Sequence, residues 1–426
     1  MQKFKLQLIF PTLLLCVLAA AAGCITGALT AGFGRVLLWI GTFRTGHLIS
    51  CVPFLPIAGV CMVWIYQKYG RESSQGMSLI FDAADGTAKR IPLRLIPLLI
   101  GSTWLTHLCG GSAGREGVAV QLGAAVSHNI GSRIPWFRNI PDAVPILTIA
   151  GMAAGFSGLF HAPLAAVCFA LEVLAIGKLE YRALLPAAIA AVTANGISVA
   201  LGLETFQVTL PEAGFAPLSV PVLLLGISSG IVGGIFTLLL KQGKIYAAKL
   251  LPNPVIRIAL CGSVLAMFLL LSGHGRYAGL GTDLIALACD GGTIYWFDFL
   301  CKLLITVCTL AIGFQGGEVT PLFAIGACLG AALAPLFGIS PVFARRTLLC
   351  RRFRQCFQYM ARSDLHRNRS VRIRVPALFR RCLHRFPPLQ RQPFHVRQTE
   401  TGSAVFAGAK IRHVFKKPYM IAHVRL

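Results

Sequence analysis

The stretch "CGGSAGREGVAVQLGAAVS", from Cys109 to Ser127, decides how this sequence is interpreted. Its glycines at 110, 111, 114 and 117 open a run that continues as an apolar helix from Val118. A glycine-rich turn lets backbone amides converge on one point, and a helix N-terminus adds roughly half a positive charge there. The pattern therefore predicts an anion site that needs no cationic side chain.

Two ionisable residues, Arg115 and Glu116, lie inside this turn. A charged group within a long apolar stretch is costly, so it is a functional candidate by default. A carboxylate at this point can compete with an anion for the same amides, and protonation would release it. Glu116 is therefore expected to link proton movement to anion movement. The alternative is that the two side chains only satisfy each other or cap the helix, which is the better interpretation of Arg115.

A second glycine turn, "GFQGGEVTPLFAIGACLG", runs from Gly313 to Gly330. Its paired glycines end at Gly317, and Pro321 stands where a helix would begin. Glu318 is another acid in an apolar setting, and Thr320 offers a hydroxyl donor for a bound anion. Two such helix starts, converging from opposite halves, would complete one dehydrated anion site.

The two turns belong to an internal duplication. "GREGVAVQLGA", from Gly114, and "GEVTPLFAIGA", from Gly317, end alike at an offset of 203 residues. "PTLLLCVLAAAAGCI", from Pro11, and "PVLLLGISSGIVGGI", from Pro221, share their prolines, leucines, a glycine and an isoleucine at an offset of 210. Two matches at similar offsets indicate a duplicated transporter architecture.

The composition places this duplication in a membrane. Hydrophobic residues make up 55% of the 426 residues and charged residues only 13%, with a mean hydropathy of +0.70. Soluble domains are about 25% charged. Roughly 20 apolar residues suffice to span a bilayer, and about ten apolar segments precede residue 340. The first apolar run could be a signal peptide ending at Cys24. A first transmembrane helix is favoured because the run continues well past that cysteine.

The character of the chain changes near Ala344. Residues 345–426 hold 20 of the 40 Lys and Arg residues and only two acids, Asp364 and Glu400. The duplication predicts that the apolar hairpin at 145–177 has a counterpart near 348–380, where the sequence is instead rich in arginine. A basic tail of this kind can bind nucleic acid or anionic lipid.

A frameshift is the favoured explanation of this tail. The segment "CRRFRQCFQY", from Cys350, can be encoded by codons that, when translated one base later, give A-A-A-F-G-S-V-S-N-T. This shifted translation resembles the hairpin sequence of the first half. "RRCLHRFPPLQRQPFHVRQ", from Arg380, permits A-V-A-F-I-A-F-L-L-F-S-G-N-R-S-M-Y-V-K in the same way. The second reads as an apolar span with a polar end that contains a tyrosine.

The glycine turns and the duplicated halves resemble the CLC family of chloride channels and proton-coupled anion exchangers, over residues 5 to 344. The resemblance implies that Glu116 is the external gating glutamate. The usual proline after the first turn is replaced by Val118, and Met77 stands near the serine position of the family's first motif. Together with "GGEVTP", these departures are similar to the fluoride-exporting branch. Fluoride is therefore the leading substrate and chloride the runner-up.

The resemblance also implies the site and the partners. It assigns proton coupling to Glu116 and anion binding to a set from both turns: Gly114, Arg115, Gly117, Val118, Met77, Gly317, Glu318, Val319 and Thr320. It implies a homodimer in the plasma (inner) membrane of the cell, with fluoride or chloride and protons as substrates, no nucleic acid and no cofactor. No nucleophile–base pair or metal-ligand spacing occurs in the sequence, so an enzyme is not expected.

We therefore expect an all-α polytopic membrane protein with a CLC-type inverted repeat, broken helices and an incomplete second repeat. The expected domains are residues 1–210, 211–344 and a basic, frame-shifted tail at 345–426. In the intact fold of the resembled family, the last helix carries a tyrosine that coordinates the anion, so the altered tail is expected to abolish activity. A voltage-gated chloride channel of the same family is one alternative. A membrane-anchored protein with a nucleic-acid- or lipid-binding tail is another.

Two histidines in apolar stretches, His107 and His161, complete the candidate residues. A lone histidine on an apolar helix is more often a hydrogen-bonded core residue than a ligand. Both are therefore expected to be core residues.

Overall fold

The computed structural model describes residues 2–70, 73–87, 90–135, 137, 140, 142–173, 180–204, 220–273, 275–290, 292–337, 405–406 and 409–410. The helices are α1 (Gln2–Gly46), α2 (Leu48–Cys51), α3 (Leu55–Tyr69), α4 (Met77–Ala84), α5 (Leu95–Leu108), α6 (Glu116–Arg133), α7 (Ala143–Phe160), α8 (Pro163–Val173), α9 (Leu184–Ala200), α10 (Val220–Leu250), α11 (Pro254–Leu271), α12 (Thr282–Cys289), α13 (Asp298–Ile312) and α14 (Val319–Leu333). Short 3₁₀ turns occur at Val52–Phe54, Ser73–Gln75, Tyr181–Ala183 and Pro335–Phe337.

These elements confirm the predicted all-helical membrane fold. Among the described residues, 6 helices are long and apolar enough to cross a bilayer. Some of the other helices are too short to cross. For example, α5 has 14 residues, which at about 1.5 Å of rise per residue gives a length of about 21 Å, less than the hydrocarbon core of about 30 Å. Because α5 stops at Leu108 and α6 starts at Glu116, their junction lies within the protein, where irregular backbone can be satisfied.

The same order of elements occurs twice along the chain. In the first half, the 8-residue α4 is followed by α5, a glycine turn and α6. In the second half, the 8-residue α12 is followed by α13, a glycine turn and α14. The starts of α6 and α14, Glu116 and Val319, are separated by the 203 residues of the sequence repeat. The domain boundaries at 210 and 344 stay a prediction.

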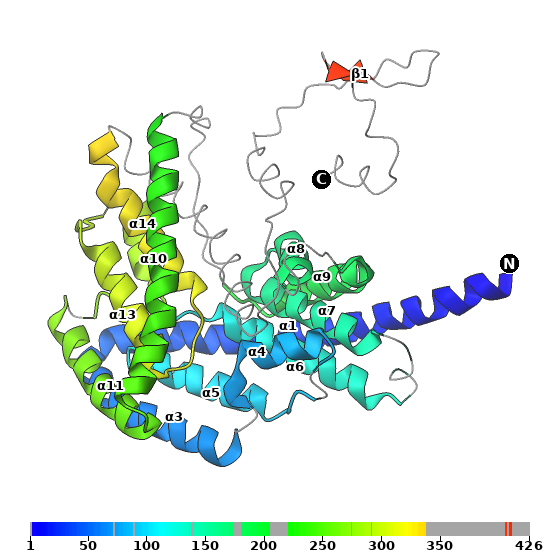
Figure 1. The fold of residues 1–426 in the computed structure, drawn as a ribbon, viewed down its shortest axis with the longest axis horizontal. Helices are drawn as coiled ribbons and strands as arrows, with labels where there is room; N and C mark the ends of the chain where they lie inside the picture. Colours follow the sequence, from blue (N-terminus) through cyan, green and yellow to red (C-terminus); the bar gives the residue numbers. More distant parts are fainter. Residues whose placement is uncertain are drawn as a thin grey trace. The chain divides into compact units, whose positions relative to one another are not determined.

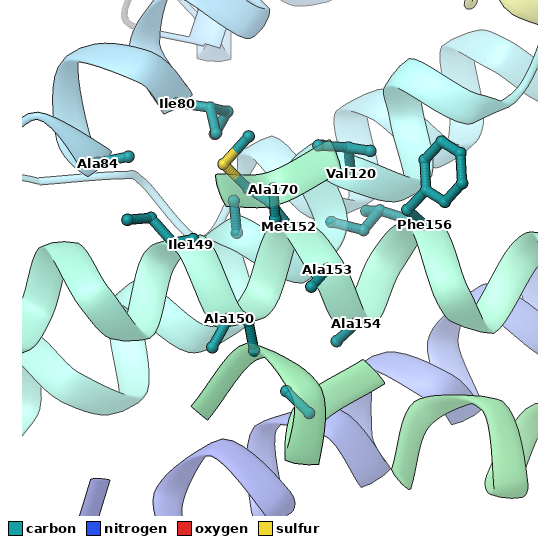
Figure 2. Packing of buried hydrophobic residues seen from close by; sticks show 14 of the residues in the cluster. Ile80, Ala84, Val120, Ile149, Ala150, Met152, Ala153, Ala154, Phe156 and Ala170 are labelled. Atoms are coloured by element: carbon teal, nitrogen blue, oxygen red, sulfur yellow. The ribbon is translucent and has the colours of Figure 1, made fainter. Parts of the chain in front are cut away.

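The helices of the first half pack around α7. α6, α8, α9 and α1 all contact it (Figure 1). Figure 2 shows Met152 and Phe156 of α7 on the side of Val120, whereas the small side chains of Ala150 and Ala154 point the opposite way; all five residues are buried in one cluster. Small side chains such as these alanines allow close approach of helices in a membrane, where packing rather than the hydrophobic effect holds helices together.

Glycines bring α6 and α7 into backbone contact. A Cβ atom added to Gly155 would meet the carbonyl oxygen of Ala119 and approach its carbonyl carbon to 2.7 Å. A Cβ atom on Gly123 would meet the carbonyl oxygen of Gly151 in the same interface. Since the obstacles are backbone atoms, a larger residue has to separate the two helices.

Gly155→Ala is expected to destabilise the protein by about 1–3 kcal/mol, the usual cost of overpacking. The matched control is Gly196→Ala in α9, where an added Cβ meets nothing within 4 Å. That change should be neutral or stabilising by about 0.5–1 kcal/mol, the helix-propensity gain. The measurement is the apparent thermal unfolding temperature in detergent. Equal effects of the two substitutions would contradict the close helix contact.

The second half has its own packing. α10, α13 and α14 lie side by side, and α12 packs on α14 (Figure 1). α3 comes from the first half of the sequence but packs against α11, and its buried residues Leu55 and Met62 join the same cluster as Ile258. The halves are therefore intertwined rather than separate globules.

Residues 377–426 form a second compact unit, distinct from residues 1–376. Within it, β1 (Val405–Phe406) pairs antiparallel with β2 (Ala409–Lys410). The expected hairpin counterpart near 348–380 and the frame-shifted segment up to residue 398 lie outside the described residues.

Candidate functional site

The first glycine turn is held by α13. Gly110 has a φ of +88°, a conformation that favours glycine, and lets the chain turn back after α5. The backbone N–H of Ser112 donates to Oγ1 of Thr309 at 3.2 Å, and the hydroxyls of Ser112 and Thr306 share a hydrogen bond of 2.8 Å. Two threonines of the second half therefore fix a loop of the first.

The two glycine turns meet in a short antiparallel bridge. The N–H of Gly114 donates to the carbonyl oxygen of Gly317 at 2.6 Å, and the N–H of Gly317 donates back to Gly114 at 2.7 Å. These residues lie 203 positions apart, so the sequence repeat is also a contact in space. The bridge places the N-termini of α6 and α14 next to each other.

The carboxylate of Glu116 lies between these two helix N-termini. Oε2 accepts hydrogen bonds from the backbone N–H of Arg115 at 3.0 Å and from that of Thr320 at 3.3 Å. Oε1 accepts from the hydroxyl of Thr320. The Glu116 side chain is 1% exposed. Its negative charge is thus held by backbone dipoles and a hydroxyl, which is how helix N-termini bind anions.

The bridge glycines are required because the carboxylate is so close to the backbone. A Cβ atom on Gly114 would meet Oε2 of Glu116, and one on Gly317 would lie 3.1 Å from that atom and from the Glu116 nitrogen. Any side chain at these positions would occupy the space that holds the carboxylate or an anion in its place.

The structure brings most of the predicted site residues to this point. Gly114, Gly317 and Thr320 border the carboxylate, and Gly117 lies beside Gly317. Arg115 caps α6 and contributes its backbone N–H, while its buried side chain leaves Nη1 without a hydrogen-bond partner among the described residues. Among the described residues the Arg115 side chain forms no direct ion pair with Glu116, although the two charges attract each other.

The remaining predicted residues have other surroundings. Val118 and Val319 are both 2% exposed and belong to hydrophobic clusters. Met77 begins α4 and is half-buried against the first-half cluster. Glu318 caps α14, and its Oε1 lies 3.8 Å from Nζ of Lys244 on α10. Lys244 was missed because it is one of three lysines near the end of α10, and nothing in the sequence distinguishes it from Lys241 and Lys249.

The two histidines differ in their surroundings. His107 is 1% exposed in the last turn of α5 and was correctly expected to be a hydrogen-bonded core residue. His161 ends α7 and is only half-buried, with Nε2 lying 3.3 Å from the hydroxyl of Ser198. The prediction of a core residue is therefore wrong for His161, because the helix stops there and leaves one side of the ring open.

The sequence profile of one protein family, described as Voltage gated chloride channel, matches residues 58–345. The chain is 36% identical over 333 residues to the "Chloride/fluoride channel protein" of Pseudomonas syringae pv. tomato, covering 74% of this chain and 72% of that protein. It is 28% identical over 353 residues to the "H(+)/Cl(-) exchange transporter ClcA" of Yersinia pseudotuberculosis serotype IB, covering 77% and 72%.

Solved structures give the same result. A crystal structure of a "CLC-type fluoride/proton antiporter" has a TM-score of 0.77 and 43% identity, and the match covers 82% of this chain and 89% of that one. A "slow cyanobacterial Cl-/H+ antiporter" has a TM-score of 0.66 at 19% identity, over 87% and 98%. The second match concerns the fold alone.

Proposed function

The chain belongs to the voltage gated chloride channel family, and on that premise we propose that its helices exchange fluoride for protons across a membrane. Transport of anions by a CLC-type fold is the general function. One observation carries the specific proposal: the Glu116 carboxylate is buried between the N-termini of α6 and α14 and takes hydrogen bonds from both.

The proposed cycle depends on competition for these donors. An anion that enters the site needs the N–H groups of Arg115 and Thr320, which the Glu116 carboxylate occupies. A proton that neutralises Glu116 weakens its hold on the donors, because a neutral acid is attracted less to the helix dipoles. The side chain then leaves with its proton as the anion enters. Anion and proton movement are coupled because the two negative charges exclude each other.

Fluoride is favoured over chloride by the donors and by the relatives. Fluoride binds water tightly, so a site must replace that water with strong hydrogen-bond donors. The Thr320 hydroxyl beside two backbone N–H groups supplies them. The similar proteins with fluoride in their names are 36% and 43% identical, whereas the chloride exchanger of Yersinia is 28% identical. Chloride exchange and a voltage-gated chloride channel remain the alternatives.

The proposed setting is a homodimer in the plasma (inner) membrane, which the family resemblance implies. The site residues are those named from the sequence, with Glu116 as the proton-coupling group and the two glycine turns as the anion-binding backbone. Enzymatic chemistry is not part of the proposal, since the relatives are named as channels and exchangers.

We also propose that residues from 345 onward are read in a shifted frame and that transport is lost in this chain. The family match ends at residue 345, where the tail of 20 basic and two acidic residues begins. A basic tail that binds nucleic acid or lipid is the competing explanation. Sequencing the gene across the codons for residues 343–350 separates the two, since one extra or missing base relative to close relatives supports the shifted frame.

Anion binding can be tested without transport, because a ligand that binds only the folded state stabilises it. Fluoride is expected to raise the thermal unfolding temperature of the purified chain at concentrations where chloride does not. Thr320→Val should remove most of this stabilisation, because the hydroxyl that contacts the carboxylate position is lost. Thr45→Val is the matched control, since the exposed Thr45 hydroxyl bonds only to its own helix. An equal effect of fluoride and chloride would overturn the choice of substrate.

A further inference from the structure

The imidazole ring of His107 lies between two carbonyl oxygens. Nδ1 is 2.8 Å from the carbonyl oxygen of Thr103, one turn earlier in α5, and Nε2 is 2.9 Å from that of Ala113 in the first glycine turn. The ring is 1% exposed. A carbonyl oxygen can only accept a hydrogen bond, whereas a neutral imidazole has one N–H donor and one lone pair. Both contacts are hydrogen bonds only when the ring carries two protons.

The contact with Ala113 connects His107 to the anion site. The carbonyl group of Ala113 belongs to the same peptide as the N–H of Gly114, which donates to Gly317 at 2.6 Å. A donor on this carbonyl polarises the peptide and strengthens the next hydrogen bond in the chain. The charge on His107 is therefore transmitted to the bridge that holds the N-termini of α6 and α14 together.

The surroundings of His107 oppose a positive charge on the ring. Arg44 from α1 donates to the carbonyl oxygen of His107 at 2.9 Å, and Lys302 from α13 lies close enough to oppose a positive ring. Tyr66 on α3, Glu116 on α6 and the α6 N-cap residue Arg115 belong to the elements that pack against α5. Burial of the ring and the two cations all disfavour the doubly protonated form, so negative charge at the anion site is needed to offset them. The balance therefore changes when that negative charge appears or disappears.

A cavity provides a route for the proton. It has a volume of about 290 Å³ and is lined by His107, Arg44 and two carboxylates, Glu204 and Asp283. Since the lining includes charged and hydroxyl side chains beside leucines and the volume is several times that of one water molecule, water can occupy it. A proton that leaves the ring can pass through this water to a carboxylate, so the step needs no other partner.

We propose that His107 is a positioning residue for the first glycine turn and takes up a second proton when negative charge lies between α6 and α14. That charge is the Glu116 carboxylate or a bound halide. When the site becomes neutral, the N–H bond at one ring nitrogen breaks and the proton moves to water in the cavity. The role of this step in the exchange cycle rests on the proposed function, but the protonation state of the ring can be measured without transport.

The test is nitrogen NMR of the full chain in lipid with ¹⁵N-labelled histidine. The His107 signals are identified by their loss in His107→Gln. In the unsubstituted chain, we expect the second protonation of His107 to occur at a pH at least about one unit higher than in Glu116→Gln, equivalent to a tenfold change in proton affinity. Equal protonation in the two chains would overturn the proposal.

A second measurement tests the positioning role. His107→Gln keeps a hydrogen-bond donor for Ala113 but cannot become charged, so the chain should fold while its stabilisation by fluoride loses its dependence on pH. His47→Gln is the matched control, because the exposed His47 ring contacts the carbonyl oxygen of Phe43 in α1 rather than the glycine turn. An unchanged pH dependence in His107→Gln would contradict the role. Absence of any fluoride effect in the unsubstituted chain would instead count against the proposed function, and the NMR comparison would still decide the inference.

Discussion

Vesicles that contain this chain are expected to show no proton-driven fluoride efflux above that of protein-free vesicles. A chain whose residues after Ala344 are translated one base later is expected to transport fluoride. The difference should be at least about 10²–10³-fold, the usual cost of losing one essential donor of an anion site. In the shifted frame, the segment from Arg380 to Gln398 permits an apolar span with a tyrosine near its end.

The physical reason is the composition of the second half. The 20 basic residues of the tail cannot cross the hydrocarbon core, where a central arginine or lysine costs about 2.5–3.5 kcal/mol or more. A second-half counterpart of the apolar hairpin at 145–177, expected near 348–380, would then be absent. Apolar faces and backbone polar groups at its interface would lack partners, which membrane proteins do not tolerate.

The comparison needs a folding control. Both chains should be purified in the same detergent and compared by size-exclusion elution and helical content before reconstitution. A chain that folds but does not transport locates the defect in the site, and a chain that aggregates locates it in the fold. Proton-dependent fluoride efflux by the chain as written, at a rate similar to that of the shifted-frame chain, would contradict the frameshift proposal.

The sequence predicted that the two helix starts converge from opposite halves, and the structure adds the Gly114–Gly317 bridge between them. The repeat offset aligned the two turns, and a duplicated transporter places its equivalent broken helices at one interface. The two helix N-termini were predicted from the glycines and from Pro321, and Thr320 followed from its place in the second turn. These features could be predicted because they depend on local backbone patterns that recur.

The side chains that surround the site could not be predicted in the same way. Arg44, His107 and Lys302 are brought together by α1, α5 and α13, which are far apart in the sequence and share no periodic pattern. Each of these residues lies in an apolar helix, where a polar residue has no sequence neighbour that shows its partner. His107 illustrates the limit: its burial was expected, but its two carbonyl contacts depend on where the glycine turn lies.

Glu116→Gln, made in the shifted-frame chain, is expected to reduce proton transport by about 10²–10⁴-fold, the usual contribution of a positioned acid or base. Glutamine has nearly the same shape but cannot bind or release a proton. Its amide N–H groups would also face the N–H donors of Arg115 and Thr320, which hold the carboxylate in the unsubstituted protein. The side chain should therefore leave the site and stop competing with the anion.

The result should separate anion flux from proton flux. If Glu116 is the coupling group, fluoride movement in Glu116→Gln no longer depends on pH, and a proton gradient no longer drives fluoride uphill. Glu180→Gln is the control, because Glu180 is exposed before the 3₁₀ turn at Tyr181–Ala183 and contacts neither glycine turn. Fluoride efflux and proton uptake are measured on the same vesicles with a fluoride electrode and a pH electrode. Uphill fluoride transport by Glu116→Gln would mean that another group carries the proton. The Glu116 carboxylate would then only occupy the anion position, without coupling fluoride movement to protons.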